Sequence, residues 1–221
     1  MSLIVNEIFT SIDGEGKTAG MLTTFVRLAG CNLRCAWCDT AYSLKKTQGT
    51  RMEVQNIVEQ IRTHAVTLTG GEPLHQADAL DLVDMLISRG ISVNVETNGS
   101  KSIARLIDTA DPRKLIVTMD WKLNSSGMEH AMLESNLPLL RKRDVLKLVI
   151  GSRIDLTRAH DIINQNKLAC MVYLSPVFGA IEPVELVDAV KQWHAEGMDV
   201  SRIRVQLQLH KIIWEPERRG V

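Results

Sequence analysis

The sequence has no long hydrophobic run and no excess of charge of either sign. Its 221 residues include 26 Lys and Arg against 26 Asp and Glu, which gives a formal net charge of zero. Without a basic excess, we expect neither a nucleic acid nor an anionic membrane as partner. No apolar stretch approaches the roughly 20 residues of a membrane-spanning helix. The N-terminus lacks a basic segment followed by an apolar one, so no signal peptide is expected.

Cysteine is also scarce, and it is unevenly distributed. Three of the four cysteines, Cys31, Cys35 and Cys38, share one CxxxCxxC segment, and Trp37 precedes the last of them. Reduced thiols are typical of the cytosol, so a cytoplasmic protein is expected. The sequence shows no internal repeat, low-complexity tract or linker, and at this length it predicts a single domain over 1–221.

The cysteine spacing predicts a metal centre. Three thiolates can bind three irons of a cubane, whereas iron–sulfur clusters normally take four cysteines, so another group would complete the site. The alternatives are unligated thiols and a structural zinc site, which would need four protein ligands. The remaining cysteine, Cys170, lies in the apolar run 168–174, where a thiol behaves as a small hydrophobic side chain within a strand.

Strand-like apolar runs alternate with helical patterns along the chain. Val54, Ile57, Val58 and Ile61 recur at helical spacing, and the segment 50–53 before them reads as a capping box. Near-continuous apolar strands between helices indicate an α/β fold with a parallel sheet covered by helices. We expect strands at 3–5, 24–28, 65–69, 91–96, 115–119, 147–150, 169–174 and 203–207. We expect helices at 54–61, 80–90, 103–107, 155–166 and 182–197.

Two glycine-containing turns follow predicted strands. The first is Thr69-Gly70-Gly71-Glu72-Pro73, and the second is Glu96-Thr97-Asn98-Gly99. Glycine turns are common after strands, so each alone is a weak signal. Parallel-sheet enzymes build their sites at the carboxyl ends of strands, where both of these turns are expected.

Taken together, the cysteine motif with its preceding aromatic residue and the TGGEP turn resemble the radical S-adenosylmethionine (SAM) enzymes. The resemblance implies an incomplete, trimmed TIM-like (β/α) barrel with mostly parallel strands and fewer helices than a full barrel. It implies a [4Fe–4S] cluster on Cys31, Cys35 and Cys38, with the amino and carboxylate groups of SAM on the fourth iron. One electron from the cluster would cleave SAM to the 5′-deoxyadenosyl radical. The GGE part of the turn would meet the SAM amino group.

The segment before the cysteines resembles one particular family within the radical SAM enzymes. It reads FTSIDGEG over 9–16, then Gly20, then FVRLAGCNLRC over 25–35, then Cys38-Asp39-Thr40. This pattern resembles the 7-carboxy-7-deazaguanine synthase family of queuosine and deazapurine biosynthesis, and the resemblance extends to His210-Lys211. It implies conversion of 6-carboxy-5,6,7,8-tetrahydropterin to 7-carboxy-7-deazaguanine, a carbon–nitrogen lyase reaction. The radical would abstract the C6 hydrogen, and ring contraction would release ammonia. The resemblance also implies Mg²⁺, a flavodoxin- or ferredoxin-type electron donor and a homodimer.

The family resemblance assigns expected roles to individual residues. Arg27 offers a rigid fork of donors that suits the substrate carboxylate. Thr40 offers a hydroxyl oxygen, the kind of ligand that Mg²⁺ prefers. Asp13 stands where many members have glutamine, and Asp120 replaces a serine. The expected substrate contacts are Ile12, Asp13, Gly14, Glu15, Arg27, Thr69 and His210. The expected SAM contacts are Trp37, Asp39, Gly71, Glu72, Asp120, Lys122, Ser175, Pro176, Val177 and Phe178.

Two other function classes compete with this interpretation. A glycyl-radical-enzyme activase is also a small radical SAM protein, but it would act on a partner protein and need no carboxylate site. The loop Asp13-Gly14-Glu15-Gly16 and the segment Cys38-Asp39-Thr40 disfavour it. A non-catalytic zinc-binding module is the third class, and the iron content of an anaerobic preparation would separate it from the other two.

Overall fold

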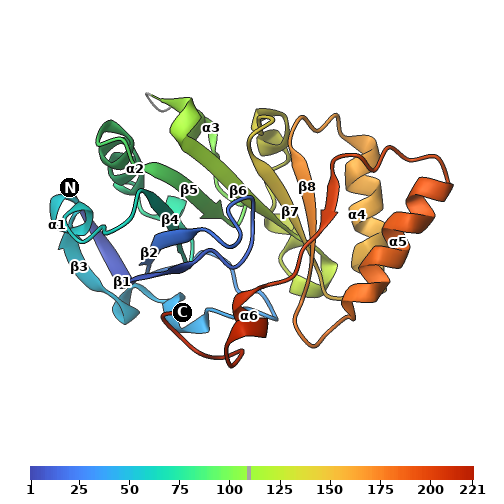
Figure 1. Cartoon of the computed structure of the whole chain (residues 1–221), viewed down its shortest axis with the longest axis horizontal. Helices are drawn as coiled ribbons and strands as arrows, with labels where there is room; N and C mark the ends of the chain where they lie inside the picture. The colour runs from blue at the N-terminus through green and yellow to red at the C-terminus, as the bar shows by residue number, and fades with distance from the viewer. Residues whose placement is uncertain (109–110) are drawn as a thin grey trace.

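Nine strands form one open sheet in the computed structural model of this chain, in the order β3-β1-β2-β4-β5-β6-β7-β8-β9 (Figure 1). The structure describes residues 1–108 and 111–221. All pairs from β2 to β9 are parallel, and β1 is antiparallel to both β2 and β3. The sheet curves without closing, so the predicted incomplete, mostly parallel barrel is confirmed.

The order of the elements follows the predicted alternation. The strands are β1 (Ser2–Ile12), β2 (Leu22–Leu28), β3 (Thr50–Glu53), β4 (Ala65–Gly70), β5 (Ser92–Thr97), β6 (Leu115–Lys122), β7 (Val145–Ile150), β8 (Met171–Pro176) and β9 (Ile203–Val205). The α-helices are α1 (Val54–Val58), α2 (Ala79–Ser88), α3 (Ala104–Ile107), α4 (Arg153–Gln165), α5 (Pro183–Ala195) and α6 (His210–Ile213). Within the described residues, no helix combines the length and apolar character needed to cross a bilayer.

Strand periodicity separates the core from the functional face of the sheet. Leu68 and Val95 are register neighbours, both are fully buried, and α2 packs against β5 on their side. Helices α4 and α5 pack against β7, β8 and β9 in the same way. Successive side chains of a strand point to opposite faces. Arg27, Thr69 and Glu96, each one residue further along its strand from a core residue, therefore face away from this helix layer.

The predicted capping box at the start of α1 is wrong. Residues Thr50–Glu53 form the edge strand β3, and no side chain caps α1. The cause is the length of β1, whose first residues extend beyond the end of β2. Ser2 pairs with Glu53 and Val5 with Thr50, so β3 supplies the hydrogen-bond partners that this overhang needs. The helix itself begins at Val54, as its apolar spacing predicts.

Several barrel helices are reduced, as the resemblance implies. The connection from β6 to β7, residues 123–144, is fully described and contains only the 3-10 turns Asn124–Ser126, Glu129–Ala131 and Glu134–Leu139. Helix α3, between β5 and β6, is a single turn of four residues. The helical layer that covers the sheet is therefore reduced at the connections on either side of β6.

The gap between the two edges of the sheet is bridged by the β1–β2 loop. Gln206, just after β9, receives a hydrogen bond from the Gly16 backbone nitrogen at 2.6 Å and donates one to the Gly16 carbonyl at 2.8 Å. The Leu209 backbone nitrogen donates to the Gly14 carbonyl at 2.9 Å. The chain segment after β9 thus holds the loop that leads into the cavity described next.

Candidate active site

A cavity of about 770 Å³ lies on the concave face of the sheet, at the carboxyl ends of the strands. This volume is typical of small-molecule sites. The cavity collects every predicted site residue except Glu72. The predicted residues that line it are Ile12, Asp13, Gly14, Glu15, Arg27, Cys31, Cys35, Trp37, Cys38, Asp39, Thr40, Thr69, Gly71, Asp120, Lys122, Ser175, Pro176, Val177, Phe178 and His210.

The three cysteines of the loop after β2 are free and partly buried at one end of the cavity. Donors surround the Cys31 sulfur: the Leu33 backbone nitrogen lies 3.4 Å from it and Asn98 Nδ2 lies 3.6 Å from it. Burial raises the pKa of the Cys31 and Cys35 thiols above their ordinary value. Metal binding would therefore release protons from these thiols.

The donor set fits an iron–sulfur cluster with an open iron. In residues 1–108 and 111–221, no three His, Cys, Asp or Glu side chains converge on a single ion position. A cubane binds each thiolate through a different iron, so its ligands need no common point. Cys170 lies in the hydrophobic core just before β8, and burial raises its pKa to about 11. It is thus held in the core as a small hydrophobic side chain, and three thiols remain for the cluster.

Gly71 brings the turn after β4 into contact with the cysteine loop. The Gly71 backbone nitrogen donates to the Leu28 carbonyl at 3.0 Å, and the Glu72 nitrogen donates to the Gly30 carbonyl at 2.9 Å. A Cβ atom at position 71 would lie 2.5 Å from the Gly30 oxygen and 2.9 Å from the Cys31 Cβ. Only glycine allows this approach, which aligns the turn with the cluster loop.

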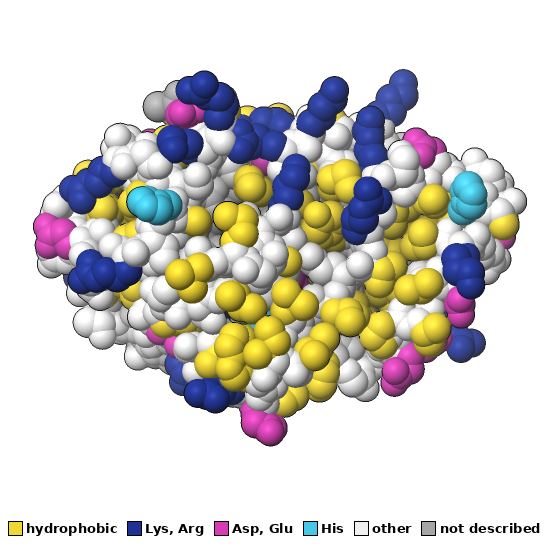
Figure 2. Space-filling view, viewed as in Figure 1, with side chains coloured by type: hydrophobic (Ala, Val, Ile, Leu, Met, Phe, Trp, Pro, Cys, Tyr) yellow, Lys and Arg dark blue, Asp and Glu magenta, His cyan; other side chains and the backbone are white. Residues whose placement is uncertain are grey.

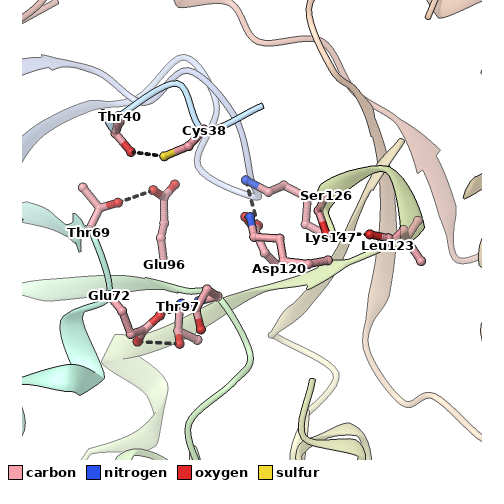
Figure 3. A network of polar contacts seen from close by, with 12 residues as sticks. Cys38, Thr40, Thr69, Glu72, Glu96, Thr97, Asp120, Leu123, Ser126 and Lys147 are labelled. Atoms are coloured by element: carbon pink, nitrogen blue, oxygen red, sulfur yellow. Dashed lines mark hydrogen bonds and ion pairs between the residues drawn. The ribbon is translucent and has the colours of Figure 1, made fainter. Parts of the chain in front are cut away.

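Glu72 lies behind this turn and does not line the cavity. Its side chain is fully buried, and its carboxylate accepts a hydrogen bond from Thr97 Oγ1 at 2.8 Å (Figure 3). It also accepts hydrogen bonds from Leu74 N at 2.9 Å and Asn98 N at 2.6 Å. Burial raises the pKa of Glu72 above its ordinary value, although the three donated hydrogen bonds favour the ionised form. Its geometry ties the turn after β4 to the end of β5.

Arg27 is oriented by neighbours on β1 and in the loop after the cysteines. Its Nε donates to Glu7 Oε1 at 2.7 Å, and Tyr42 donates its hydroxyl to the same oxygen at 3.1 Å. The Arg27 guanidinium carbon lies 5.8 Å from the centroid of the Tyr42 ring. With Nε occupied, the terminal nitrogens of the guanidinium are left for a ligand in the cavity.

Thr69 and Glu96 form a polar pair on neighbouring strands, and in Figure 3 they lie opposite Cys38 and Thr40. Thr69 donates its hydroxyl to Glu96 Oε2 at 2.8 Å. Burial raises the pKa of Glu96 to about 8, although the charge of Lys147 acts in the opposite direction. The raised pKa favours the protonated form of this carboxyl, and a protonated carboxyl can donate a hydrogen bond as well as accept one.

A buried chain of charges crosses the floor of the cavity. Lys147 Nζ contacts Asp120 Oδ1 at 2.9 Å (Figure 3) and Glu15 Oε1 at 2.7 Å, and Asp120 also pairs with Lys122. Burial opposes the ionisation of Asp120, but the two ammonium groups outweigh it and lower its pKa. Burial likewise disfavours the charged form of Lys147, yet Asp120, Glu15 and Glu96 hold its pKa well above the ordinary value. Asp120 and Lys147 are therefore ionised, and this chain of charges links the β1–β2 loop to the end of β6.

The β1–β2 loop presents backbone rather than side chain at Asp13. The Asp13 side chain is buried, and its Oδ2 accepts hydrogen bonds from Thr18 at 2.6 Å and Thr67 at 2.9 Å. Burial raises the pKa of Asp13, and the two hydroxyl donors oppose that rise. His210 packs directly over Gly14, where a side chain would collide with its ring. Of the buried side-chain atoms that the structure describes, Glu15 Oε2 is one that lacks a hydrogen-bond partner.

Thr40 immediately precedes a 3-10 turn, Ala41–Ser43, but its side chain makes no capping hydrogen bond. The hydroxyl instead lies 3.8 Å from the Cys38 sulfur, at the cavity wall (Figure 3). An oxygen that is not used in a cap is available to a cation or to water, which fits the predicted Mg²⁺ ligand.

The remaining predicted SAM contacts meet at the wall formed by the cysteine loop and the end of β8. Trp37 donates its Nε1 to Ser125 Oγ at 3.1 Å, and the Lys122 ammonium lies 5.0 Å from the centroid of its ring. The run Ser175–Phe178 continues this wall, and Phe178 is exposed at the rim. Asp39 also lines the cavity. An aromatic face beside a hydrophobic turn suits a planar adenine.

Sequence reasoning missed several residues of the cavity. Lys147 was expected only as the first residue of an apolar strand, and Glu96 only as part of a turn motif. Tyr42 and the segment 216–221 carried no signal, yet both line the cavity. The alternation of side chains along β7 could have indicated a role for Lys147. A lysine whose side chain points inward from a buried strand needs a partner of opposite charge.

The chain is similar to known proteins over its whole length. Residues 26–120 match the family model of the radical SAM superfamily. A 7-carboxy-7-deazaguanine synthase of Clostridium acetobutylicum is 40% identical over 228 aligned positions, which cover 100% of both chains. One from Thermoplasma acidophilum is 36% identical and covers 96% of this chain and 97% of its own length.

Solved structures agree on the fold. The crystal structure of QueE from Escherichia coli has a TM-score of 0.71 and 23% identity, and it covers 93% of this chain and 94% of that one. Streptococcus suis SuiB bound to S-adenosylmethionine has a TM-score of 0.53 and 12% identity, and it covers 80% of this chain and 47% of that one. At these identities the two structures support the fold, whereas the full-length relatives establish the family. The chain belongs to the 7-carboxy-7-deazaguanine synthase family of the radical SAM superfamily.

Proposed function

We propose that this protein converts 6-carboxy-5,6,7,8-tetrahydropterin to 7-carboxy-7-deazaguanine, with loss of ammonia, as a carbon–nitrogen lyase of one domain. The observation that carries this proposal is the meeting of three free thiols and the Arg27 guanidinium in one cavity. The full-length relatives are named for this reaction. Their names favour the small-molecule reaction over activation of a glycyl radical enzyme.

The protein's own residues would bind and orient the pterin. Arg27, held by Glu7 and Tyr42, would bind the substrate carboxylate through its free nitrogens. The backbone of Ile12, Asp13 and Gly14 would meet the edge of the pterin ring. The unpartnered oxygen of Glu15 would accept a hydrogen bond from a ring or amino N–H of the substrate. Thr69 and His210 would flank the ring.

The cofactor end of the cavity would hold the cluster and SAM. Cys31, Cys35 and Cys38 would bind a [4Fe–4S] cluster, and Gly71, with Glu72 behind it, would set the turn that meets the SAM amino group. When bound, the cluster and SAM supply the radical that removes the substrate C6 hydrogen. The remaining SAM contacts would be Trp37, Asp39, Asp120, Lys122, Ser175, Pro176, Val177 and Phe178. The ionised pair of Asp120 and Lys122 would hold this wall in place without a net charge.

Mg²⁺ would be bound by the Thr40 hydroxyl and the substrate carboxylate. The hydroxyl makes no capping hydrogen bond and lies 3.8 Å from the Cys38 sulfur at the cavity wall, which supports the assignment. A hard cation beside an anionic ligand stabilises the bound pose electrostatically, and small displacements of a substrate are costly in rate. Thr40 would thus help to fix the orientation of the pterin in the cavity.

The proposal also covers the protein's surroundings. A flavodoxin- or ferredoxin-type protein would supply the electron, and the protein would act in the cytoplasm. We propose a homodimer, because hydrophobic side chains gather around α6 (Figure 2), where Leu207, Ile212 and Ile213 are exposed. Contiguous apolar surface of this kind is typical of protein–protein contacts. The mass in solution, measured by light scattering, tests the dimer.

The decisive experiment is an anaerobic incubation of the reconstituted protein with SAM, a strong reductant and the carboxytetrahydropterin. We expect a product of the mass of 7-carboxy-7-deazaguanine together with ammonia, and neither of them from Cys35→Ala. SAM cleavage without conversion of the pterin would contradict the proposed substrate. Bound zinc in place of iron in an anaerobic preparation would contradict the radical mechanism.

A further inference from the structure

The segment after α6 returns across the end of the cavity that holds Arg27. Residues 216–221 line the cavity together with Arg27 and Tyr42. In Figure 1 the chain after α6 runs back beneath β1 and β2, next to the segment that follows the cysteine loop. One side of the Arg27 site is therefore built from a part of the chain about 190 residues away from it in sequence.

Arg219 is the residue of this segment that contacts Glu7 and Tyr42, the neighbours of Arg27. Its guanidinium carbon lies 3.7 Å from the centroid of the Tyr42 ring, which is a stacked cation–π arrangement. Its Nη2 lies 3.7 Å from Glu7 Oε2 and 3.5 Å from Asn6 Oδ1. Arg219 thus approaches the Glu7 oxygen that does not receive the hydrogen bond from Arg27.

Glu7 is therefore shared by two guanidinium groups. Its Oε1 is 2.7 Å from Arg27 Nε, and its Oε2 faces Arg219. With Glu7 paired to Arg27 alone, the two charges would cancel, and an incoming anion would meet a neutral pair. With Arg219 present, the three groups together carry one positive charge. That surplus favours a ligand anion at Arg27.

We propose that Arg219 is a positioning residue that makes the site selective for the substrate carboxylate, by sharing Glu7 with Arg27 and stacking on Tyr42. This inference rests on the proposed function, because the ligand anion in question is the carboxylate of the pterin. The Arg219 side chain is 54% exposed whereas that of Arg27 is 13% exposed, so Arg219 acts through Glu7 and Tyr42 from the rim.

The test compares two ligands that differ only in the carboxylate. Binding of 6-carboxytetrahydropterin and of tetrahydropterin is measured anaerobically by calorimetry on the reconstituted protein with SAM. Arg219→Gln removes the charge, and Arg219→Lys keeps the charge but loses the planar stack. Arg105→Gln, at an exposed site on α3, is the matched control for loss of one guanidinium.

We expect Arg219→Gln to weaken binding of the carboxylated pterin about three- to tenfold, with little change for the other ligand, since the group is partly exposed and screened. Arg219→Lys should fall between it and the wild type, and Arg105→Gln should match the wild type. In turnover, the KM should rise by a similar factor while kcat changes less than about twofold. The melting temperature should stay constant, because Arg219 lies at the surface.

Equal weakening for both ligands, or none for either, would overturn the role of Arg219. A wild-type protein that neither binds nor converts the carboxylated pterin would instead overturn the proposed function. A wild type that converts it, beside an Arg219→Gln variant with unchanged discrimination, would leave the proposed function standing and remove Arg219 from it. The two failures are therefore distinguishable in the same set of measurements.

Discussion

Replacing Glu96 with glutamine should alter the pH dependence of stability in a defined direction. Burial raises the pKa of Glu96 to about 8 in the folded protein, against an ordinary value of 4.5. Between these two values the folded protein keeps a proton that the unfolded chain releases. Stability from this group is therefore fully present below the lower pKa, and it is lost as the pH rises through the upper one.

The magnitude follows from proton linkage. One proton held only by the folded state lowers the unfolding free energy by up to about 1.4 kcal/mol per pH unit. Between about pH 6 and pH 7.5, Glu96 should therefore cost the wild type at most about 2 kcal/mol of unfolding free energy. Glutamine resembles the protonated acid and can still accept the hydrogen bond from Thr69. In Glu96→Gln, the unfolding free energy should not fall by this amount as the pH rises.

Urea unfolding of the cluster-free protein at several pH values measures this difference. The difference in unfolding free energy between the wild type and Glu96→Gln separates the contribution of Glu96 from those of the other titrating groups. The matched control is Glu59→Gln, at an exposed position where the carboxylate accepts a hydrogen bond from Gln55. It should follow the wild type across the range. A difference between wild type and Glu96→Gln that stays constant with pH would show that Glu96 is already ionised, and the burial argument would fail.

Three further tests, with five substitutions in all, address other parts of the site. Cys35→Ala should lose the iron and Cys170→Ala should retain it, as an iron and sulfide assay would show; the reverse result would end the cluster assignment. Thr40→Ser should keep Mg²⁺-stimulated turnover and Thr40→Val should lose it, because valine has no ligand oxygen; equal stimulation in both would place the ion elsewhere. Glu72→Gln should lower the unfolding free energy by about 2–3 kcal/mol, because its amide would face a buried donor, and the melting temperature by roughly 4–12 °C. An unchanged melting temperature would contradict the structural role of Glu72.

The fold was predictable where the signal is local. Apolar runs such as 65–68 and the helical spacing that starts at Val54 report burial directly, and both correspond to observed elements. The predicted helix 54–61 is too long, because α1 ends at Val58. The capping box failed because Thr50–Glu53 satisfies a local helix pattern while the overhang of β1 offers a ladder of backbone partners. Pairing with a strand about fifty residues earlier in the sequence leaves no mark in a short window of sequence.

The site was predictable in proportion to how much of it is contiguous in sequence. The cysteines and the turn at Gly71 are compact motifs, and the structure brings them together. Lys147 pairs with Glu15, which is 132 positions away in sequence. The residues next to either of them in sequence give no indication of this pair. Glu72 looked like a cofactor contact because it belongs to a motif, whereas its side chain points behind the turn. Motifs locate a segment but do not say which way each side chain faces.

The bridge between Gly16 and Gln206 has a consequence for how the protein matures. These residues are 190 positions apart, so the bridge cannot form until most of the chain has been synthesised. Domains begin to fold during synthesis, but contacts of such long separation form late, because the loop-closure entropy must be met first. Strands β2 to β8 can pair while the β1–β2 loop is still unanchored. The sheet can therefore form before the β1–β2 loop is anchored. The ability to bind the pterin should be the last property that the newly made protein acquires.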